Sequence, residues 1–171
     1  MKIKHLALTI AASAVASIAV GAAIGSVAVA APKHDFVSVA EAKATYPSVA
    51  RGFESKLPAG VRWPESLPAG VLDSIAEEEA DGQTVQIERG YLEGLAAMHW
   101  LCSWEGELVS ATDAGDQGRA SVALSRLAQF VKLDWYQENY EDPEGEWFAR
   151  VVEPARQGDL SGVIEDLAAC G

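Results

Sequence analysis

The sequence lacks the short motifs that build the common hydrolytic and metal-dependent active sites. It has no GxSxG serine elbow, the nearest string being LSGVI at residues 160–164, and no HExxH zinc motif. A calcium-binding EF-hand loop starting at Asp113 also fails, because its twelfth position is Leu124 instead of a glutamate. We therefore predict no catalytic residue, no cofactor and no metal site, and favour a protein that is not an enzyme.

Acidic residues are absent from the first 30 positions, and this absence divides the chain. Lys2 and Lys4 precede an uncharged stretch over residues 6–31. The pattern predicts an export signal peptide over residues 1–30, cleaved between Ala30 and Ala31, with Ala28 and Ala30 as the small residues that the peptidase needs. A retained N-terminal membrane anchor is the alternative, since about 20 apolar residues can span a bilayer. Both interpretations place the rest of the chain outside the cytoplasm, either secreted or anchored at the cell envelope.

The region after residue 30 is strongly acidic. It holds 11 basic against 25 acidic side chains, a formal net charge of −14. Such a charge repels phosphate backbones and anionic lipid headgroups, so neither nucleic acid nor a membrane surface is an expected partner. Membrane contact is expected only through the N-terminal segment if it is not cleaved.

Cysteine is nearly absent, with one residue in a tryptophan-rich stretch and one at the C-terminus. After export, two cysteines meet an oxidising compartment, and only one intramolecular pairing exists, Cys102 with Cys170. His99 lies three positions before Cys102 on the same predicted helix face, a spacing that metal ligands also use. A disulfide would remove the thiolate, so we favour a structural bridge and a hydrogen-bonded histidine.

Hydrophobic spacing predicts a mainly α protein, a small helical bundle of about four main helices. The expected helices are a buried central one over residues 91–112, an amphipathic one over 117–133 capped by Asp116, one entered through Asp142 and Pro143, and a last one capped by Asp159. The predicted organisation is a leader over 1–30, a proline-rich extended or short-helix segment over 31–70, and a helical domain over 71–171.

Shorter elements are expected ahead of the central helix. Ser38 and Glu41 predict a capped helix that Pro47 ends or kinks, and residues 72–80 predict another. Residues 84–88 alternate like a strand for which the sequence shows no partner.

These features favour an exported helical domain that binds an envelope or secreted protein without catalysis. An exposed apolar groove near Trp63, Trp135 or Trp147 would provide the contact surface. The alternative is a secreted hydrolase acting on cell-wall sugar or peptide through carboxylates. Glu105 and Glu107 cannot form its acid pair, because residues two apart on a helix point about 200° apart.

Overall fold

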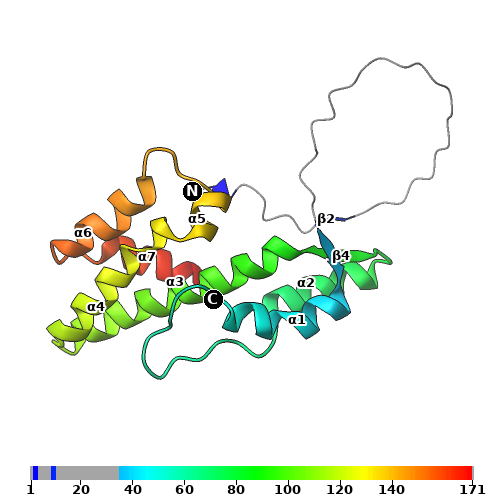
Figure 1. Ribbon diagram of the computed structural model, residues 1–171, viewed down its shortest axis with the longest axis horizontal. Helices are drawn as coiled ribbons and strands as arrows, with labels where there is room; N and C mark the ends of the chain where they lie inside the picture. Colours follow the sequence, from blue (N-terminus) through cyan, green and yellow to red (C-terminus); the bar gives the residue numbers. More distant parts are fainter. Residues whose placement is uncertain (1, 4–8, 11–34, 171) are drawn as a thin grey trace, which may run out of the picture.

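The computed structural model describes residues 2–3, 9–10 and 35–170, and this part of the chain is mainly helical (Figure 1). The helices are α1 (Val39–Arg51), α2 (Ala69–Ala80), α3 (Arg89–Asp113), α4 (Gln117–Leu127), α5 (Asp134–Asn139), α6 (Glu153–Arg156) and α7 (Ser161–Leu167). The chain also forms two short 3₁₀ helices, η1 (Phe130–Lys132) and η3 (Ala168–Cys170), and a π-helix, η2 (Phe148–Val152). The predicted mainly α fold with one disulfide is confirmed, whereas the division into segments 1–30, 31–70 and 71–171 stays a prediction.

Short strands accompany the helices. β4 (Val85–Glu88) lies between β2 (Thr9–Ile10) and β3 (Phe36–Ser38), and both of its pairings are antiparallel. β1 (Lys2–Ile3) pairs with β5 (Tyr140–Glu141). The predicted strand at residues 84–88 is confirmed, and its partner β3 lies just ahead of the Ser38 cap, in register Val37 with Ile87. Both of these side chains are buried, which ties the start of α1 to the core.

The predicted leader lies almost entirely outside the described residues. This applies to Ala28, Ala30 and Ala31, so export and cleavage stay predictions. Among the described residues, none of the helices combines the length and apolarity that crossing a bilayer requires.

The central helix α3 carries two hydrophobic clusters along its length. Its 25 residues span about 37 Å at 1.5 Å per residue. Leu92 and Ala96, in its first half, pack with α1, α2 and β4, whereas Trp100 and Leu108, further along, belong to a cluster with α4 and the C-terminal helices. Figure 1 shows α3 running between the two groups, with α1 and α2 drawn below it and α5 and α6 above it. The predicted central helix is thus confirmed.

Several helix ends differ from expectation. Ser38 accepts the Glu41 N–H as predicted, but α1 continues through Pro47 to Arg51. Asp116 caps α4 as predicted, by accepting the Arg119 N–H at 3.0 Å. However, α4 ends at Leu127 instead of residue 133, because the chain then tightens into the 3₁₀ turn η1.

Asp142 and Asp159 each act as caps, although not at the expected helical position. Asp142 accepts the N–H groups of Glu146 and Trp147, so Pro143 lies in a turn ahead of the helical stretch and not in its first turn. Asp159 accepts the Ser161 N–H at 2.9 Å at the start of α7. The sequence therefore identified the capping side chains correctly but misplaced the Asp142 helix start.

Candidate functional site

A disulfide joins the middle of α3 to the end of the chain. Cys102 and Cys170 are bonded, with their Cα atoms 5.8 Å apart and 68 positions between them. This is the pairing predicted from the cysteine count. Cys170 lies on η3, a turn with no buried residue, so the covalent bond is the main attachment of this end.

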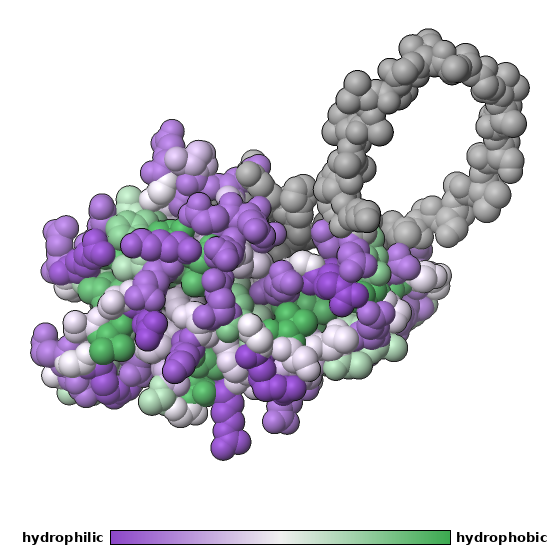
Figure 2. Space-filling model, viewed as in Figure 1, coloured by the Kyte–Doolittle hydropathy of each residue, from purple (hydrophilic) through white to green (hydrophobic). Residues whose placement is uncertain are grey.

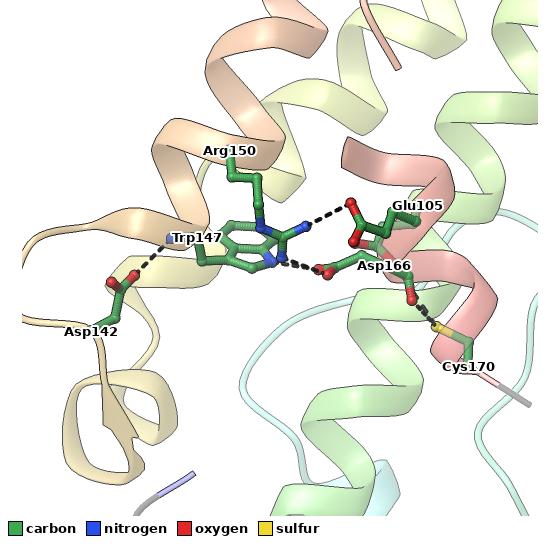
Figure 3. A network of polar contacts seen from close by, with 7 residues as sticks. Glu105, Asp142, Trp147, Arg150, Asp166 and Cys170 are labelled. Atoms are coloured by element: carbon green, nitrogen blue, oxygen red, sulfur yellow. Dashed lines mark hydrogen bonds and ion pairs between the residues drawn. The ribbon is translucent and has the colours of Figure 1, made fainter. Parts of the chain in front are cut away.

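A fully buried carboxyl group lies next to the disulfide. Glu105 is on α3, one turn beyond Cys102, and has an exposed fraction of 0%. Its Oε2 atom lies 3.8 Å from Cys170 Sγ, and its Oε1 atom has no hydrogen-bond partner within the described residues. Figure 3 shows Glu105 and Cys170 on facing elements. The sequence pattern does not predict this buried position, because Glu105 resembles any other glutamate in an acidic chain.

Asp166 of α7 accepts hydrogen bonds from two side chains of the preceding helical stretch. Its Oδ2 atom accepts the Trp147 indole N–H at 2.6 Å, and its Oδ1 atom accepts from Arg150 Nη2 at 2.8 Å. Arg150 also lies 3.7 Å from the exposed Glu165. These contacts hold α7 against η2, next to Glu105 of α3 (Figure 3).

The electrostatics of this network favour a neutral Glu105. Burial and, to a lesser extent, the negative charge of Asp166 together raise the pKa of Glu105 from 4.5 to about 8, while Arg150 acts in the opposite direction. The pKa of the nearby Tyr140 rises to about 12, first through burial and then through the charges of Asp166 and Glu105. At neutral pH, Glu105 therefore carries a proton beside the disulfide.

The local geometry of η2 allows α7 to pack closely. Pro154 has no N–H for the Arg150 carbonyl four residues earlier, and η2 closes with the Glu153 N–H donating to Phe148 five residues back. Gly162 of α7 lies against this Arg150 carbonyl, where an added Cβ would overlap it. The glycine thus permits the close approach that brings Asp166 to Trp147 and Arg150.

The three tryptophans predicted at a partner surface lie in different environments. Trp147 and Trp135 are only 1% and 6% exposed, so their rings offer little surface to a partner, and the predicted contact groove near them stays a prediction. They pack around the buried Phe130, whose ring also contacts Trp100 and two tyrosines, Tyr136 and Tyr140. Trp63 is half-buried against Phe53 and His99. A helical wheel drawn for each helix separately could not predict that the 3₁₀ turn η1 places Phe130 at the centre of these aromatic side chains.

The loop between α1 and α2 is attached to α3 by polar contacts. Trp100 and Trp104 both donate their indole N–H groups to the Lys56 carbonyl at 2.9 Å. His99 Nε2 lies 3.0 Å from the Arg62 carbonyl. Trp100 and Trp104 are buried, and His99 is hydrogen-bonded as expected.

An acidic groove lies where α1, α3 and α5 meet. It has a volume of about 420 Å³, its lining includes Phe53 and the edge of the largely buried Trp135, and no lysine or arginine among the described residues lines it. Its carboxylates are all exposed and come from three separate parts of the chain: Glu54, Glu93, Asp134 and Glu138. Within residues 35–170 none of them forms an ion pair. We call this feature the acidic groove.

The donors of this chain offer little to a metal ion. Within the described part of the chain, one set of three side chains from histidine, cysteine or acidic residues is close enough to share an ion, namely Cys102, Glu105 and Cys170. Both sulfurs are already bonded to each other, so the set has no thiolate to contribute.

Comparison with protein-family models, with curated proteins and with solved structures found no match for this chain.

Proposed function

We propose that this chain is an exported helical domain that binds a lysine- or arginine-containing segment of a partner protein in the acidic groove, without catalysis. The observation that carries the proposal is the groove itself, whose lining combines four exposed carboxylates with two aromatic residues and includes no cation from the described part of the chain. The partner is an envelope or secreted protein, because the disulfide suits an oxidising compartment.

The chemistry of the groove specifies an amphipathic cationic occupant. Carboxylates attract ammonium and guanidinium groups and steer their approach, while Phe53 and Trp135 suit the aliphatic stems of lysine and arginine. In Figure 2, hydrophilic side chains separate several small hydrophobic patches on the face shown. Such a surface favours an association led by charge over a broad apolar contact.

The hydrolase alternative has no corresponding observation. Glu105 is the carboxyl with a raised pKa that a general acid would need, but it is fully buried. A substrate cannot reach it without movement of the surrounding helices. The carboxylates that are accessible, in the acidic groove, instead suit the binding of a cation.

Binding can be tested with labelled peptides and the full chain. A fluorescent nine-residue peptide alternating lysine and leucine should bind by anisotropy, and raising the salt from 50 mM to 500 mM should weaken it at least about fivefold. The same peptide with glutamate in place of lysine should not bind. Equal binding of both peptides would contradict the proposal.

Variants locate the binding surface. Glu93→Gln combined with Asp134→Asn removes two carboxylates of the groove and should weaken the lysine peptide about tenfold. The matched control is Glu77→Gln with Glu79→Gln on α2, two exposed residues that do not line the groove and whose loss changes the net charge equally. If both double variants weaken binding to the same extent, the attraction is a general charge effect and the groove is not the site.

Export is tested separately. Cell fractionation followed by mass spectrometry with and without reductant should find the chain outside the cytoplasm with its disulfide formed. Full-length protein in the cytosol with two free thiols would contradict the export proposal while leaving peptide binding untouched.

A further inference from the structure

The Cys102–Cys170 disulfide is less buried than a structural disulfide in a protein core. Cys102 and Cys170 are both half-buried, and Cys170 lies near the chain end on the turn η3, where Ala168 and Ala169 are exposed. This turn continues directly from α7 and contributes no buried residue to the hydrophobic core. A thiol could therefore displace Cys170 without unfolding the core, which contains Trp100 and Leu101 on the same helix α3.

A proton donor lies against the sulfur that would leave. Glu105 Oε2 is 3.8 Å from Cys170 Sγ, while its Oε1 atom makes no hydrogen bond to any described residue. A buried carboxyl with one unused oxygen is costly to keep, since burial of an unpaired polar group opposes folding. Glu105 lies on α3 one turn from Cys102, and Figure 3 shows its side chain close to Cys170.

We propose that the Cys102–Cys170 disulfide takes part in thiol–disulfide exchange with a partner protein dithiol or a small-molecule thiol, and that Glu105 supplies the proton for the departing Cys170 sulfur. The incoming thiolate attacks Cys102 Sγ and forms a mixed disulfide. The S–S bond breaks, its electron pair goes to Cys170 Sγ, and this sulfur takes the Glu105 proton to become a thiol. A second thiolate then attacks the mixed disulfide and releases Cys102 as a thiolate, which water protonates.

The neighbours of Glu105 keep the proton in place before the reaction. Asp166 on α7 favours the protonated form through its charge, and Arg150 on η2 opposes it; Tyr140 on β5 is the other titratable group that interacts with Glu105. Burial is the largest of these influences, and their combined effect raises the pKa of Glu105 to about 8. Glu105 is therefore protonated at neutral pH and can donate to the departing Cys170 sulfur. Protonation of this sulfur prevents it from attacking the mixed disulfide and re-forming the Cys102–Cys170 bond.

The test is the rate of reduction of the full chain by dithiothreitol, measured by alkylation and mass spectrometry between pH 6 and pH 9.5. The second-order rate constant is expressed per dithiothreitol thiolate, which removes the titration of the reagent. For the natural chain this constant should be level at low pH and fall above about pH 8 as Glu105 loses its proton. A constant that stays level across the whole range overturns the proposal and needs no variant.

Variants assign the pH dependence to Glu105. Glu105→Gln should reduce the constant at pH 7 by at least about tenfold and abolish its fall at high pH. Asp166→Asn removes a neighbouring negative charge, so the fall should begin at lower pH than in the natural chain. The matched control Glu107→Gln, on the same helix but paired with Arg119 in the exposed region, should keep the natural profile. A Glu105→Gln profile identical to the natural one would refute the assigned role.

Discussion

Trp147 donates its indole N–H to Asp166 Oδ2 over 2.6 Å, joining two residues that are 19 positions apart. The same carboxylate accepts from Arg150, so one side chain on α7 satisfies a buried donor and a cation on the preceding helical stretch. These hydrogen bonds hold α7 next to Glu105. Asp166 and Arg150 therefore set the electrostatic environment of Glu105 and of the neighbouring disulfide.

Removal of the Asp166 carboxylate should destabilise the fold. Asp166→Ala leaves the buried Trp147 N–H without an acceptor and Arg150 without its closest anion, so we expect a loss of about 2–4 kcal/mol in the free energy of unfolding. Urea denaturation at pH 7 measures it. The control Glu165→Ala removes an exposed carboxylate 3.7 Å from Arg150 and should cost less than about 0.5 kcal/mol. Comparable losses for both variants would show that the Trp147 bond is unimportant.

Stability should fall as the pH rises through the range in which Glu105 titrates. The folded protein keeps a proton at Glu105 up to about pH 8, whereas the unfolded chain loses it near pH 4.5. Between these values folding requires proton uptake, so the contribution of Glu105 to the free energy of unfolding decreases with pH, in total by on the order of 3–5 kcal/mol.

Glu105→Gln isolates this contribution. The variant keeps the shape of the neutral carboxyl and has no proton to lose, so its stability relative to the natural chain should increase between pH 4.5 and pH 8. Urea unfolding at a series of pH values gives the difference. A difference independent of pH would mean that Glu105 is ionised in the folded protein.

Reductive loss of the disulfide should cost a large share of the stability. A closed loop of 68 positions corresponds to about 4 kcal/mol in the chain-entropy model. The double variant Cys102→Ala with Cys170→Ala should therefore unfold at a clearly lower urea concentration than the oxidised chain. Because the variant cannot re-form the bond, it should also show no response to added reductant, unlike the natural chain.

Gly162 should not tolerate a side chain. A Cβ there would overlap the Arg150 carbonyl oxygen and lie 3.3 Å from Val151 Cα, and both are backbone atoms that cannot rotate away. Gly162→Ala should lower the free energy of unfolding by about 2–4 kcal/mol. Gly106→Ala on α3 meets nothing within 4 Å and should instead raise it by about 0.5–1 kcal/mol, since alanine favours a helix interior.

Asp142 should stabilise the protein only while it is ionised. Although burial acts against the charge, hydrogen bonds from the Tyr136 hydroxyl and from the Trp147 and Glu146 N–H groups hold its pKa below the ordinary 3.8. Its contribution is therefore present at neutral pH and lost as the pH falls through the lowered pKa.

Replacement of Asp142 tests this cap. Asp142→Ala should cost about 2–3 kcal/mol at pH 7, because it leaves a hydroxyl and two N–H groups without their acceptor. Glu144→Ala, an exposed acid in the same loop, is the control and should change little. Thermal unfolding at pH 7 and pH 2.5 should show the difference between the two variants shrinking at the lower pH.

Features that depend on neighbouring residues or on residue counts could be predicted from the sequence. Helical spacing located α3 and α2, Ser38 and Asp116 were recognised as caps, and two cysteines permitted a single bridge. These are local or combinatorial properties, because a cap needs only the next few N–H groups and a pair of cysteines has one partner each.

Which side chains come into contact depends on the three-dimensional packing of the elements. The strand at Val85 obtains its partner from β3, Trp135 and Trp147 turn inward around Phe130, and Glu105 comes to lie beside Cys170. Each outcome depends on how η1, η2 and Gly162 orient elements that are distant in sequence. Close packing selects one arrangement from many with the same hydrophobic pattern, and that choice leaves one glutamate buried with its proton and four carboxylates exposed around a groove.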